Sequence, residues 1–299
     1  MKTVVIKTDG VCLGDTISFF PYFEEYRKKN NVHVIAMTAW GTLFDNTYPN
    51  IEFVDWNSPV PKNDKFIQMA VQMGENRGMP YTTQAATQLG LPIKEIRPII
   101  RPKVSGNLFG KKYVTIATKS TTQCKFWNYP NGWEMVIDWL KDKGYEVVAV
   151  DREDYFGKTG YMNKIPDGAK NWTGRFPIEY RVNEIYNSEF FIGLGSGLSW
   201  LAWGCGKKVV MIAGHSAPNS EFQEDNYRVY NPNVCSNCWG DPLAVWNAYN
   251  WTWCPRHEGD LQEFECTKMI TPKMVIVKVE ELIKDLEKSL TKNKNMVTC

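Results

Sequence analysis

The chain has 299 residues, of which 35 are lysine or arginine and 33 are aspartate or glutamate. Because the charges nearly balance, the chain lacks the strong positive field that binding to nucleic acid requires, and we expect no nucleic-acid partner. Hydrophobic residues make up 43% of the chain, and the length exceeds that of one ordinary domain. We therefore expect two domains, each with its own buried core.

The N-terminal residues, MKTVVIKTDG, contain no apolar stretch of the kind found in export signals. The longest uncharged run, residues 190–206, is shorter than a membrane span and is interrupted by glycines. We therefore expect a cytoplasmic protein with no stable membrane insertion.

The first strand–helix unit places a carboxylate where a ligand could bind. Residues 3–7 are mostly β-branched, and a loop then leads to Gly14, Asp15 and a helix that runs to the basic residues 27–29. Asp15 would lie at the helix N-terminus, above the carboxyl end of a strand, where open α/β sheets bind ligands. It could cap the helix or act as a general base in a cleft.

The rest of the first half is partly legible. Strands are expected at residues 32–37 and 51–54, and a Met- and Gln-rich helical portion is expected near residues 66–73. Another helix is expected near residues 83–89. Gly and Ser interrupt the periodicity at residues 104–110, so we place the domains at 1–108 and 109–299.

The second half repeats the alternation of strands and helices. Strands are expected at residues 113–117 and 145–150, and helices at 133–143 and 178–187. The last helix, 272–290, has an apolar face that needs a partner surface. This pattern predicts an α/β fold of two Rossmann-like, doubly wound domains that face each other across a cleft.

The segment 190–214, FFIGLGSGLSWLAWGCGKKVVMIAG, predicts a strand, a glycine turn, a helix and a second strand. The three glycines 193, 195 and 197 would let the backbone approach a ligand closely. The helix that opens at Ser196 or Gly197 would direct unpaired N–H groups toward an anion such as a diphosphate. An ordinary tight turn of a parallel sheet would also account for the pattern.

The loop after the strand 113–117 contains groups suited to a nucleoside diphosphate. Thr121 supplies a hydroxyl, Lys125 a cation and Trp127 a ring for stacking. Asp151, at the end of the next strand, could accept ribose hydroxyls or cap a turn. A solvated lysine is the plain alternative for Lys125.

Four of the eight cysteines are clustered at Cys235, Cys238, Cys254 and Cys266. Four thiolates close a tetrahedral metal site, and such a site would stabilise the loop-rich segment 231–271. The thiolates alone do not distinguish iron from zinc. A closed site leaves no open position for a substrate, so its role would be structural. His215 and His257 are interpreted as surface or structural residues.

Three other classes of protein fit the sequence less well. A nicotinamide oxidoreductase would have its glycine turn early in the chain and a third, more widely spaced glycine. An iron–thiolate electron carrier would have two Cys-x2-Cys pairs, and this chain has one. A zinc-ribbon module for nucleic acid would need a basic face, whereas the cysteine segment is acidic.

Several motifs resemble known families. Gly14-Asp15, Lys125-x-Trp127 and the 190–214 segment resemble the family 9 inverting heptosyltransferases, which have the GT-B fold. The segments FIGLGSGLSWLAW, NPNVCSNCWGDP, WTWCP and FECTKMITPKMV resemble more closely the bacterial autotransporter heptosyltransferases, which attach heptose to serine side chains of adhesins and carry a four-cysteine iron finger.

This resemblance implies roles for individual residues. Asp15 would be the catalytic base, Lys125 would bind phosphate, and Cys235, Cys238, Cys254 and Cys266 would bind iron, with zinc as the alternative. The donor-binding loop would comprise Gly195, Ser196, Gly197 and Leu198. Trp200 stands where the lipopolysaccharide enzymes usually have histidine, which fits the autotransporter branch.

The resemblance also implies an activity. We expect inverting transfer of heptose from ADP-heptose to a hydroxyl, that of a protein serine side chain, with no divalent metal at the diphosphate. A different nucleotide sugar with a glycan acceptor, or a non-catalytic sugar-nucleotide-binding protein, are the alternatives. The sequence starts at its first strand, so we expect it to lack the extra N-terminal domain of that branch, and a homo-oligomer is compatible with it.

Overall fold

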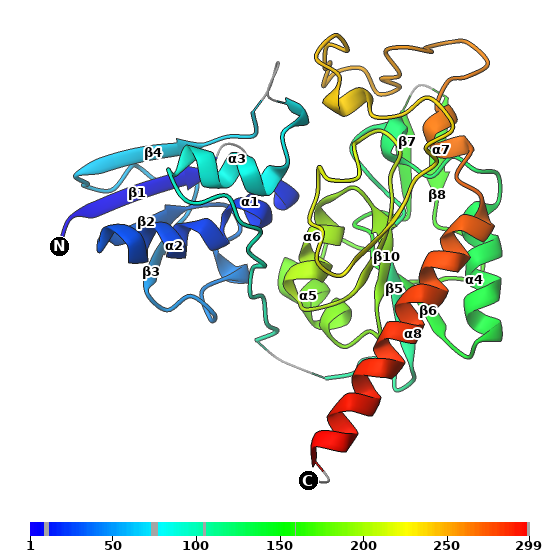
Figure 1. Ribbon diagram of the computed structural model, residues 1–299, viewed down its shortest axis with the longest axis horizontal. Coiled ribbons are helices and arrows are strands. Elements are labelled where there is room, and N and C mark those ends of the chain that lie inside the picture. Colours follow the sequence, from blue (N-terminus) through cyan, green and yellow to red (C-terminus); the bar gives the residue numbers. More distant parts are fainter. Residues whose placement is uncertain (9–11, 73–76, 104–105, 159, 298–299) are drawn as a thin grey trace.

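The structure is a computed structural model that describes the backbone of residues 1–8, 12–72, 77–103, 106–158 and 160–297. Side chains are described in the same ranges up to residue 289 and at residue 291. Two separate parallel sheets, each flanked by helices, form the two halves of the molecule (Figure 1). The expected boundary at residues 104–110 includes 104–105, which lie outside the described residues, so the domain limits stay a prediction.

The first sheet belongs to the N-terminal half, and all of its described pairings are parallel. Its strands lie side by side in the order β3 (Ile51–Val54), β2 (His33–Met37), β1 (Thr3–Thr8) and β4 (Lys65–Met69). The helices of this half are α1 (Leu13–Phe19), α2 (Pro21–Asn30) and α3 (Tyr81–Gln88), with a 3-10 turn, η1, at Gly41–Leu43. The carboxyl end of the central strand β1 therefore leads to α1.

Two expectations for this half were wrong. The segment 66–69, expected to be helical, is the edge strand β4, which pairs with β1 so that Phe66 lies opposite Val5. Long-range pairing outweighs local helix preference there; Met73 lies outside the described residues. The helix expected to run from Gly14 to residue 29 is two helices, because Pro21 has no N–H to continue the first one and begins the second.

The second sheet is larger, and its described strands are all parallel. In spatial order they are β12 (Asn226–Val229), β11 (Val209–Ile212), β10 (Phe191–Leu194), β5 (Tyr113–Ile116), β6 (Glu146–Ala149) and β9 (Lys170–Asn171). An antiparallel hairpin of β7 (Tyr155–Lys158) and β8 (Tyr161–Lys164) follows β6. The sequence did not predict this hairpin, β9 or β12.

Helices cover both faces of the second sheet. They are α4 (Gly132–Asp142), α5 (Ile178–Tyr186), α6 (Gly197–Gly204) and α8 (Pro272–Val297), with the short helices η3 (Gln123–Lys125), η4 (Cys238–Gly240) and α7 (Glu265–Lys268) in the loops. One core joins α4 and α8 to the sheet through residues such as Val136, Ile212 and Val279. This half is doubly wound, as expected.

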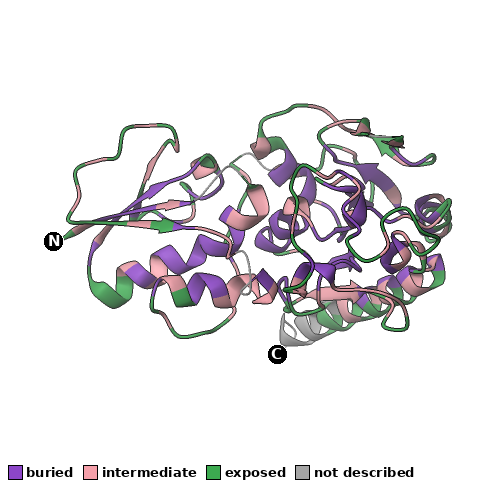
Figure 2. Cartoon of the chain, turned by 90° about the horizontal axis from the view of Figure 1, so that it is seen from above, coloured by how far each residue is buried: buried purple, intermediate pink, exposed green. Residues whose placement is uncertain are grey.

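A second core contains side chains from both halves. Buried segments are found in each half (Figure 2). This second core contains Ile6 and Phe20 of the first half together with Phe191, Trp200 and Trp203 of the second half, and these side chains are almost completely buried. Phe20 stacks on Phe44, with ring centroids 3.8 Å apart. The two halves therefore share apolar packing as well as a covalent linker.

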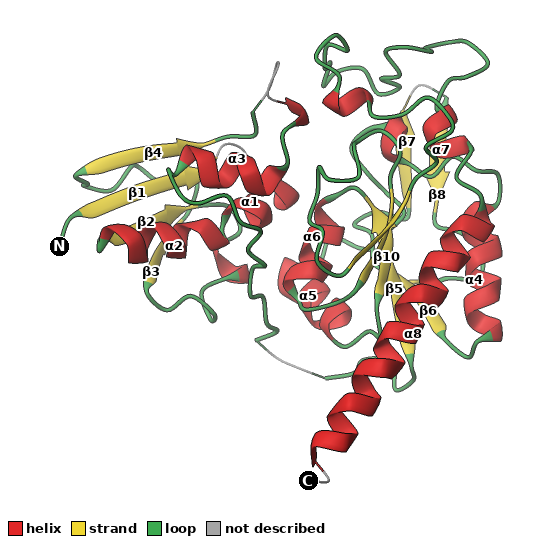
Figure 3. Ribbon diagram, in the orientation of Figure 1, coloured by secondary structure: helices red, strands yellow, loops and turns green. Residues whose placement is uncertain are grey.

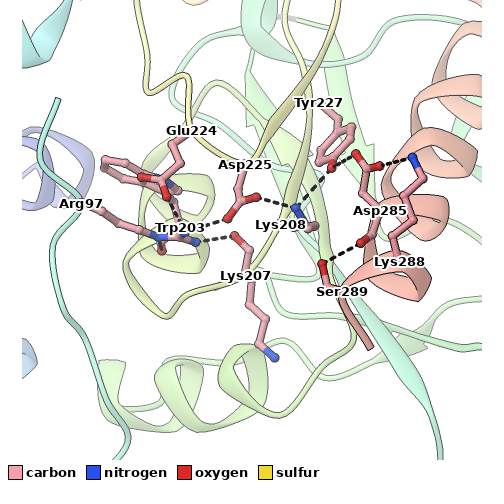
Figure 4. Close-up of polar contacts among 10 residues, drawn as sticks. All are labelled: Arg97, Trp203, Lys207, Lys208, Glu224, Asp225, Tyr227, Asp285, Lys288 and Ser289. Atoms are coloured by element: carbon pink, nitrogen blue, oxygen red, sulfur yellow. Dashed lines mark hydrogen bonds and ion pairs between the residues drawn. The ribbon is translucent and has the colours of Figure 1, made fainter. Parts of the chain in front are cut away.

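The linker after α3 is fixed to the second half by Arg97. Its guanidinium donates to the carbonyl oxygens of Trp203 at 2.7 Å and Lys207 at 2.9 Å, and it pairs with Asp225 at 2.7 Å. Polar contacts continue from there to the last helix (Figure 4). In order, these residues are Asp225, Lys208, Tyr227, Asp285 and Lys288.

Within the described residues, no helix combines the length and the apolar character needed to cross a membrane. The segment 231–271 is mostly loop and lies over one end of the second sheet (Figure 3). We call this segment the finger.

Candidate active site at the glycine turn

The glycine turn lies between β10 and α6, at the carboxyl edge of the second sheet. The N–H of Ser196 donates to the carbonyl oxygen of Leu194 at 2.7 Å, and the hydroxyl of Ser199 donates to the same oxygen at 2.6 Å. Helix α6 then begins at Gly197, so its first N–H groups have no acceptor within the helix. Such a helix start can bind an anion.

The start of α1 contacts this turn directly. A Cβ atom added to Gly14 would lie 3.3 Å from the Cα of Gly197, and one added to Gly197 would lie 3.1 Å from the backbone nitrogen of Gly14. The absence of both side chains therefore lets the two backbones meet. As a result Asp15, in the first turn of α1, lies beside the glycine turn of the other half.

Asp15 in the first half lies near enough to Lys125 in the second half for the lysine charge to act on its carboxyl group. Burial raises the pKa of Asp15, while the charge of Lys125 and a hydrogen bond with the side chain of Cys12 lower it in part. Among the described residues, no ion pair occupies the Lys125 ammonium group. The sequence predicted both residues, and the structure brings them together as a carboxylate and an available cation.

Three further side chains line the site, and the sequence analysis assigned none of them to it. Tyr81, at the start of α3, is close enough to Asp15 and Glu221 for their charges to raise its pKa, after the larger effect of burial. The Glu221 carboxylate lies 2.9 Å from the position of a Cβ on Gly195, and it pairs with the buried Arg228. Arg228 thus neutralises the carboxylate next to the turn.

His215 is the third such residue; the sequence analysis named it but interpreted it as a surface or structural residue. It is 4% exposed, its Cε1 atom lies 3.5 Å from the Cβ position of Gly195, and its Nδ1 has no hydrogen-bond partner in the described part of the chain. Burial, then the charges of Lys125 and Arg228, lower its pKa well below the ordinary value, so the imidazole is neutral. A single histidine forms no sequence motif. Its position next to Gly195 becomes visible only in the structure, where the ends of β10 and β11 lie side by side.

The remaining predicted donor-site residues differ in their exposure. Thr121 is exposed in the lysine loop, and Ser196, Gly197 and Leu198 are half-buried. Trp200 is buried, and its ring packs edge-to-face against Tyr81 with centroids 5.8 Å apart. Trp200 therefore supports the contact between the halves from inside the core.

Trp127 and Asp151 have structural partners in the core. The Trp127 indole N–H donates to the carbonyl oxygen of Ile270 at 2.8 Å, and its ring packs against Trp133. Asp151 is 1% exposed and accepts bonds from the N–H groups of Thr118 and Lys119 at 2.8 and 3.0 Å. Stacking by Trp127 and ribose binding by Asp151 stay predictions. The hydrogen bonds of Asp151 favour the alternative, in which it caps a turn.

The four predicted metal ligands lie in one region of the finger, joined by a fifth thiol. Cys238, Cys254 and Cys124 pack in one cluster with Trp253 and Phe264. Burial raises the pKa of Cys266 well above its ordinary value. The other cause is a set of neighbouring thiols, in order of effect Cys124, Cys238, Cys254 and Cys235.

The thiols do not form a closed metal site in this structure. Within the described residues, no three side chains of the His, Cys, Asp and Glu type stand close enough to hold a metal ion, so the four-thiolate site stays a prediction. None of the seven described cysteines forms a disulfide, so no disulfide competes for the sulfurs. Four cysteine thiols are a donor set that suits iron or zinc, and metal binding would displace their protons.

Comparison with known proteins identifies relatives along nearly the whole chain. No family model matches. The chain is 35% identical to the autotransporter heptosyltransferase TibC of Escherichia coli over 97% of its own length and 73% of that protein. It is 35% identical to the heptosyltransferase BAHTCr of Citrobacter rodentium, over 92% of the chain and 69% of that protein. A protein of Burkholderia thailandensis named as the inactive autotransporter heptosyltransferase BimC is 28% identical.

Solved structures agree with these relatives. The iron-containing, dodecameric TibC of enterotoxigenic E. coli matches with a TM-score of 0.90 over 95% of this chain and 77% of that chain, at 33% identity. The E. coli lipopolysaccharide heptosyltransferase II matches in fold with a TM-score of 0.64 at 13% identity. The two-sheet architecture is thus the GT-B type. Together with the identity to TibC, it shows that this chain belongs to the autotransporter heptosyltransferases, a family of glycosyltransferases.

Proposed function

We propose that this enzyme transfers heptose from ADP-heptose to a hydroxyl group, with a serine side chain of a protein as the acceptor. The observation that supports the proposal is the close contact of Gly14, which precedes Asp15, with Gly197 of the glycine turn, near enough to Lys125 for its charge to act on Asp15. TibC has been solved in complex with ADP-D-β-D-heptose, which supports the choice of donor.

The proposed reaction is a single displacement at the anomeric carbon. Asp15 takes the proton from the acceptor hydroxyl as its oxygen attacks, and the bond from the carbon to the diphosphate oxygen breaks, so configuration inverts and ADP leaves. The sugar passes through an oxocarbenium-like state, as in glycosidases. The raised pKa of Asp15 brings it closer to the range useful for a base near neutral pH.

The leaving diphosphate gains negative charge as the bond breaks. Lys125 and the N–H groups at Gly197 and Leu198 would stabilise that charge, and the hydroxyl groups of Thr121 and Ser196 would donate further hydrogen bonds. His215 is neutral and can donate a hydrogen bond without adding charge. These groups serve the role that a divalent metal has in other transferases, so we propose that none is needed at the diphosphate.

The four thiols of Cys235, Cys238, Cys254 and Cys266 would hold iron in the finger, with zinc as the alternative. TibC is described as iron-containing and dodecameric. For this chain we propose a structural metal, which fixes the loops, and a homo-oligomer. A cytoplasmic location, where a sugar nucleotide is available, completes the proposal.

Binding and transfer should be measured separately. Calorimetry with ADP-heptose, UDP-glucose and GDP-mannose on the metal-loaded protein tests the donor, and we expect selective binding of ADP-heptose. Mass spectrometry of an autotransporter passenger fragment incubated with enzyme and donor then tests the acceptor, with a mass gain of one heptose on serine as the expected result. Binding of another donor only would overturn the sugar assignment.

The identity of 28% to a relative named as inactive keeps a second function open to the same experiment. A sugar-nucleotide-binding protein without catalysis would bind ADP-heptose in calorimetry and transfer nothing to any acceptor. The presence of Asp15 in the site favours the enzyme.

A further inference from the structure

Arg77 is a buried cation that the proposed reaction does not use. It lies between β4 and α3 in the first half and is 3% exposed. Among the described residues, no carboxylate stands within ion-pair distance of it. A buried guanidinium without a carboxylate needs other acceptors, because an unsatisfied buried charge is strongly destabilising.

The finger supplies these acceptors through its backbone. Arg77 donates to four carbonyl oxygens: those of Trp239 at 2.6 Å, Cys238 at 3.2 Å, Asp241 at 2.7 Å and Ala244 at 2.6 Å. Its guanidinium also lies over the ring of Trp239, 5.3 Å from the centroid. The N–H groups of a guanidinium have fixed directions, so their bonds to four carbonyl oxygens of one loop define the shape of that loop.

The next residue strengthens the contact between Arg77 and the finger. A Cβ atom added to Gly78 would lie 3.0 Å from the carbonyl oxygen of Gly240 and 3.1 Å from its Cα. Only a glycine lets the two backbones approach so closely. The first half therefore holds residues 238–244 of the finger by two independent contacts.

The same part of the finger is bonded to the catalytic edge of the second sheet. The N–H of Trp239 donates to the carbonyl oxygen of His215 at 2.8 Å, and the N–H of Asn237 donates to that of Gly214 at 3.0 Å. The N–H of Gln123 donates to the carbonyl oxygen of Trp251 at 2.9 Å, two residues before Lys125. The finger thus connects Arg77 with the segments that carry His215 and Lys125.

We propose that Arg77 is a positioning residue that locks the finger onto the first half and so keeps Asp15 beside the glycine turn of the second half. Arg77 precedes Tyr81 by four residues, and Tyr81 lies next to Asp15. The contact between Arg77 and the finger is therefore close to the candidate site in the first half as well as in the second. The finger is then a bridge between the halves in addition to a metal-binding element. The expected effect on turnover rests on the proposed function, and the contact itself does not.

Hydrogen–deuterium exchange tests the bridge without any assay of transfer. In Arg77→Met, amide exchange should rise at least tenfold in residues 238–244 and at the start of α1. Gly78→Ala, which removes no charge, should produce the same pattern, whereas Gly106→Ala, where the added Cβ meets no atom within 4 Å, should not. Unchanged exchange in both Arg77→Met and Gly78→Ala would overturn the proposal.

Kinetics separate positioning from general damage. We expect kcat of Arg77→Met to fall at least tenfold while the donor KM and the calorimetric affinity for ADP stay within threefold, with partial recovery in Arg77→Lys. Arg175→Met, which removes an exposed arginine, is the matched control and should retain wild-type kcat. If Arg77→Met and Gly78→Ala each lost ADP affinity and turnover to the same extent, Arg77 would not be a positioning residue. If the wild type transfers no heptose, the exchange experiment still decides on the bridge.

Discussion

The glycine turn and the finger lie at the same edge of the second sheet but are stabilised differently. The turn follows β10, a central strand that is paired with β5 on one side and β11 on the other and is fully buried. The finger has little regular structure among its described residues, essentially η4 and α7. Its order comes from side chains, such as Trp246 against Trp253 with centroids 4.6 Å apart.

The two regions therefore control different properties of the enzyme. The sheet determines the position of the turn, so substitutions around the turn should alter chemistry and leave the fold intact. The finger depends on thiols, a buried arginine and ring contacts, so substitutions there should alter stability first. Substitutions in each region test this division.

Asp15→Asn should have the largest effect on activity. The amide cannot accept the proton of the acceptor hydroxyl, so kcat should fall by about 10²- to 10⁴-fold, the usual contribution of a general base. The affinity for ADP-heptose, measured by calorimetry, should stay within a few fold because the donor contacts remain. Near wild-type transfer by the variant would exclude Asp15 as the base.

Lys125→Met should weaken donor binding. Hydrogen bonds to charged groups contribute about 1.5–3 kcal/mol, so the dissociation constant for ADP-heptose should rise about ten- to a hundredfold. Lys119→Met is the matched control, since that lysine lies in the same loop but its charge acts on Asp151 and Asp154. Equal affinities of the two variants would remove Lys125 from the diphosphate site.

Cys238→Ser should lower stability rather than chemistry. If the four thiols bind a metal, the loss of one ligand removes binding free energy of about 3 kcal/mol at a metal concentration a hundredfold above Kd. The corresponding fall in Tm is on the order of 5–10 °C. Cys205→Ala, a buried thiol outside the finger, should keep its metal content in elemental analysis. A Cys238→Ser protein with wild-type metal content and Tm would contradict the metal finger.

The smallest effect concerns pH. Asp15 acts as a base only when ionised, so kcat/KM should fall as pH drops through its pKa, which burial raises. The charge of Lys125 lowers that pKa, so Lys125→Met should raise it and move the acidic limb of the profile to higher pH. Lys119→Met should leave the limb in place. A shift of the limb to lower pH in Lys125→Met would show that the two groups do not interact as described.

The sequence predicted the elements whose patterns are local. The glycine turn, the strand leading to Asp15 and the amphipathic helix α8 all carry their own signals. The strand β4 was taken for a helix because its character depends on β1, about sixty residues away. Local patterns do not report such pairings.

The candidate site shows the same limit. Asp15 and Lys125 could be predicted because glycines, hydroxyls and motifs surround them in the chain. Arg77 and His215 could not, because their environment consists of residues at least twenty positions away: the finger carbonyls for the first and Gly195 for the second. Cys124 was scattered in the sequence, yet it packs against Cys238 and Cys254.

The core that continues through both halves limits how far the enzyme can open. Trp200, Trp203 and Phe222 pack in one cluster with the α1 and α2 side chains of the first half. A wide rotation between the halves would expose these rings to water at about 25 cal/mol for every Å² uncovered. Substrate entry and product release should therefore proceed through small movements of loops, while the two halves stay close together throughout the catalytic cycle.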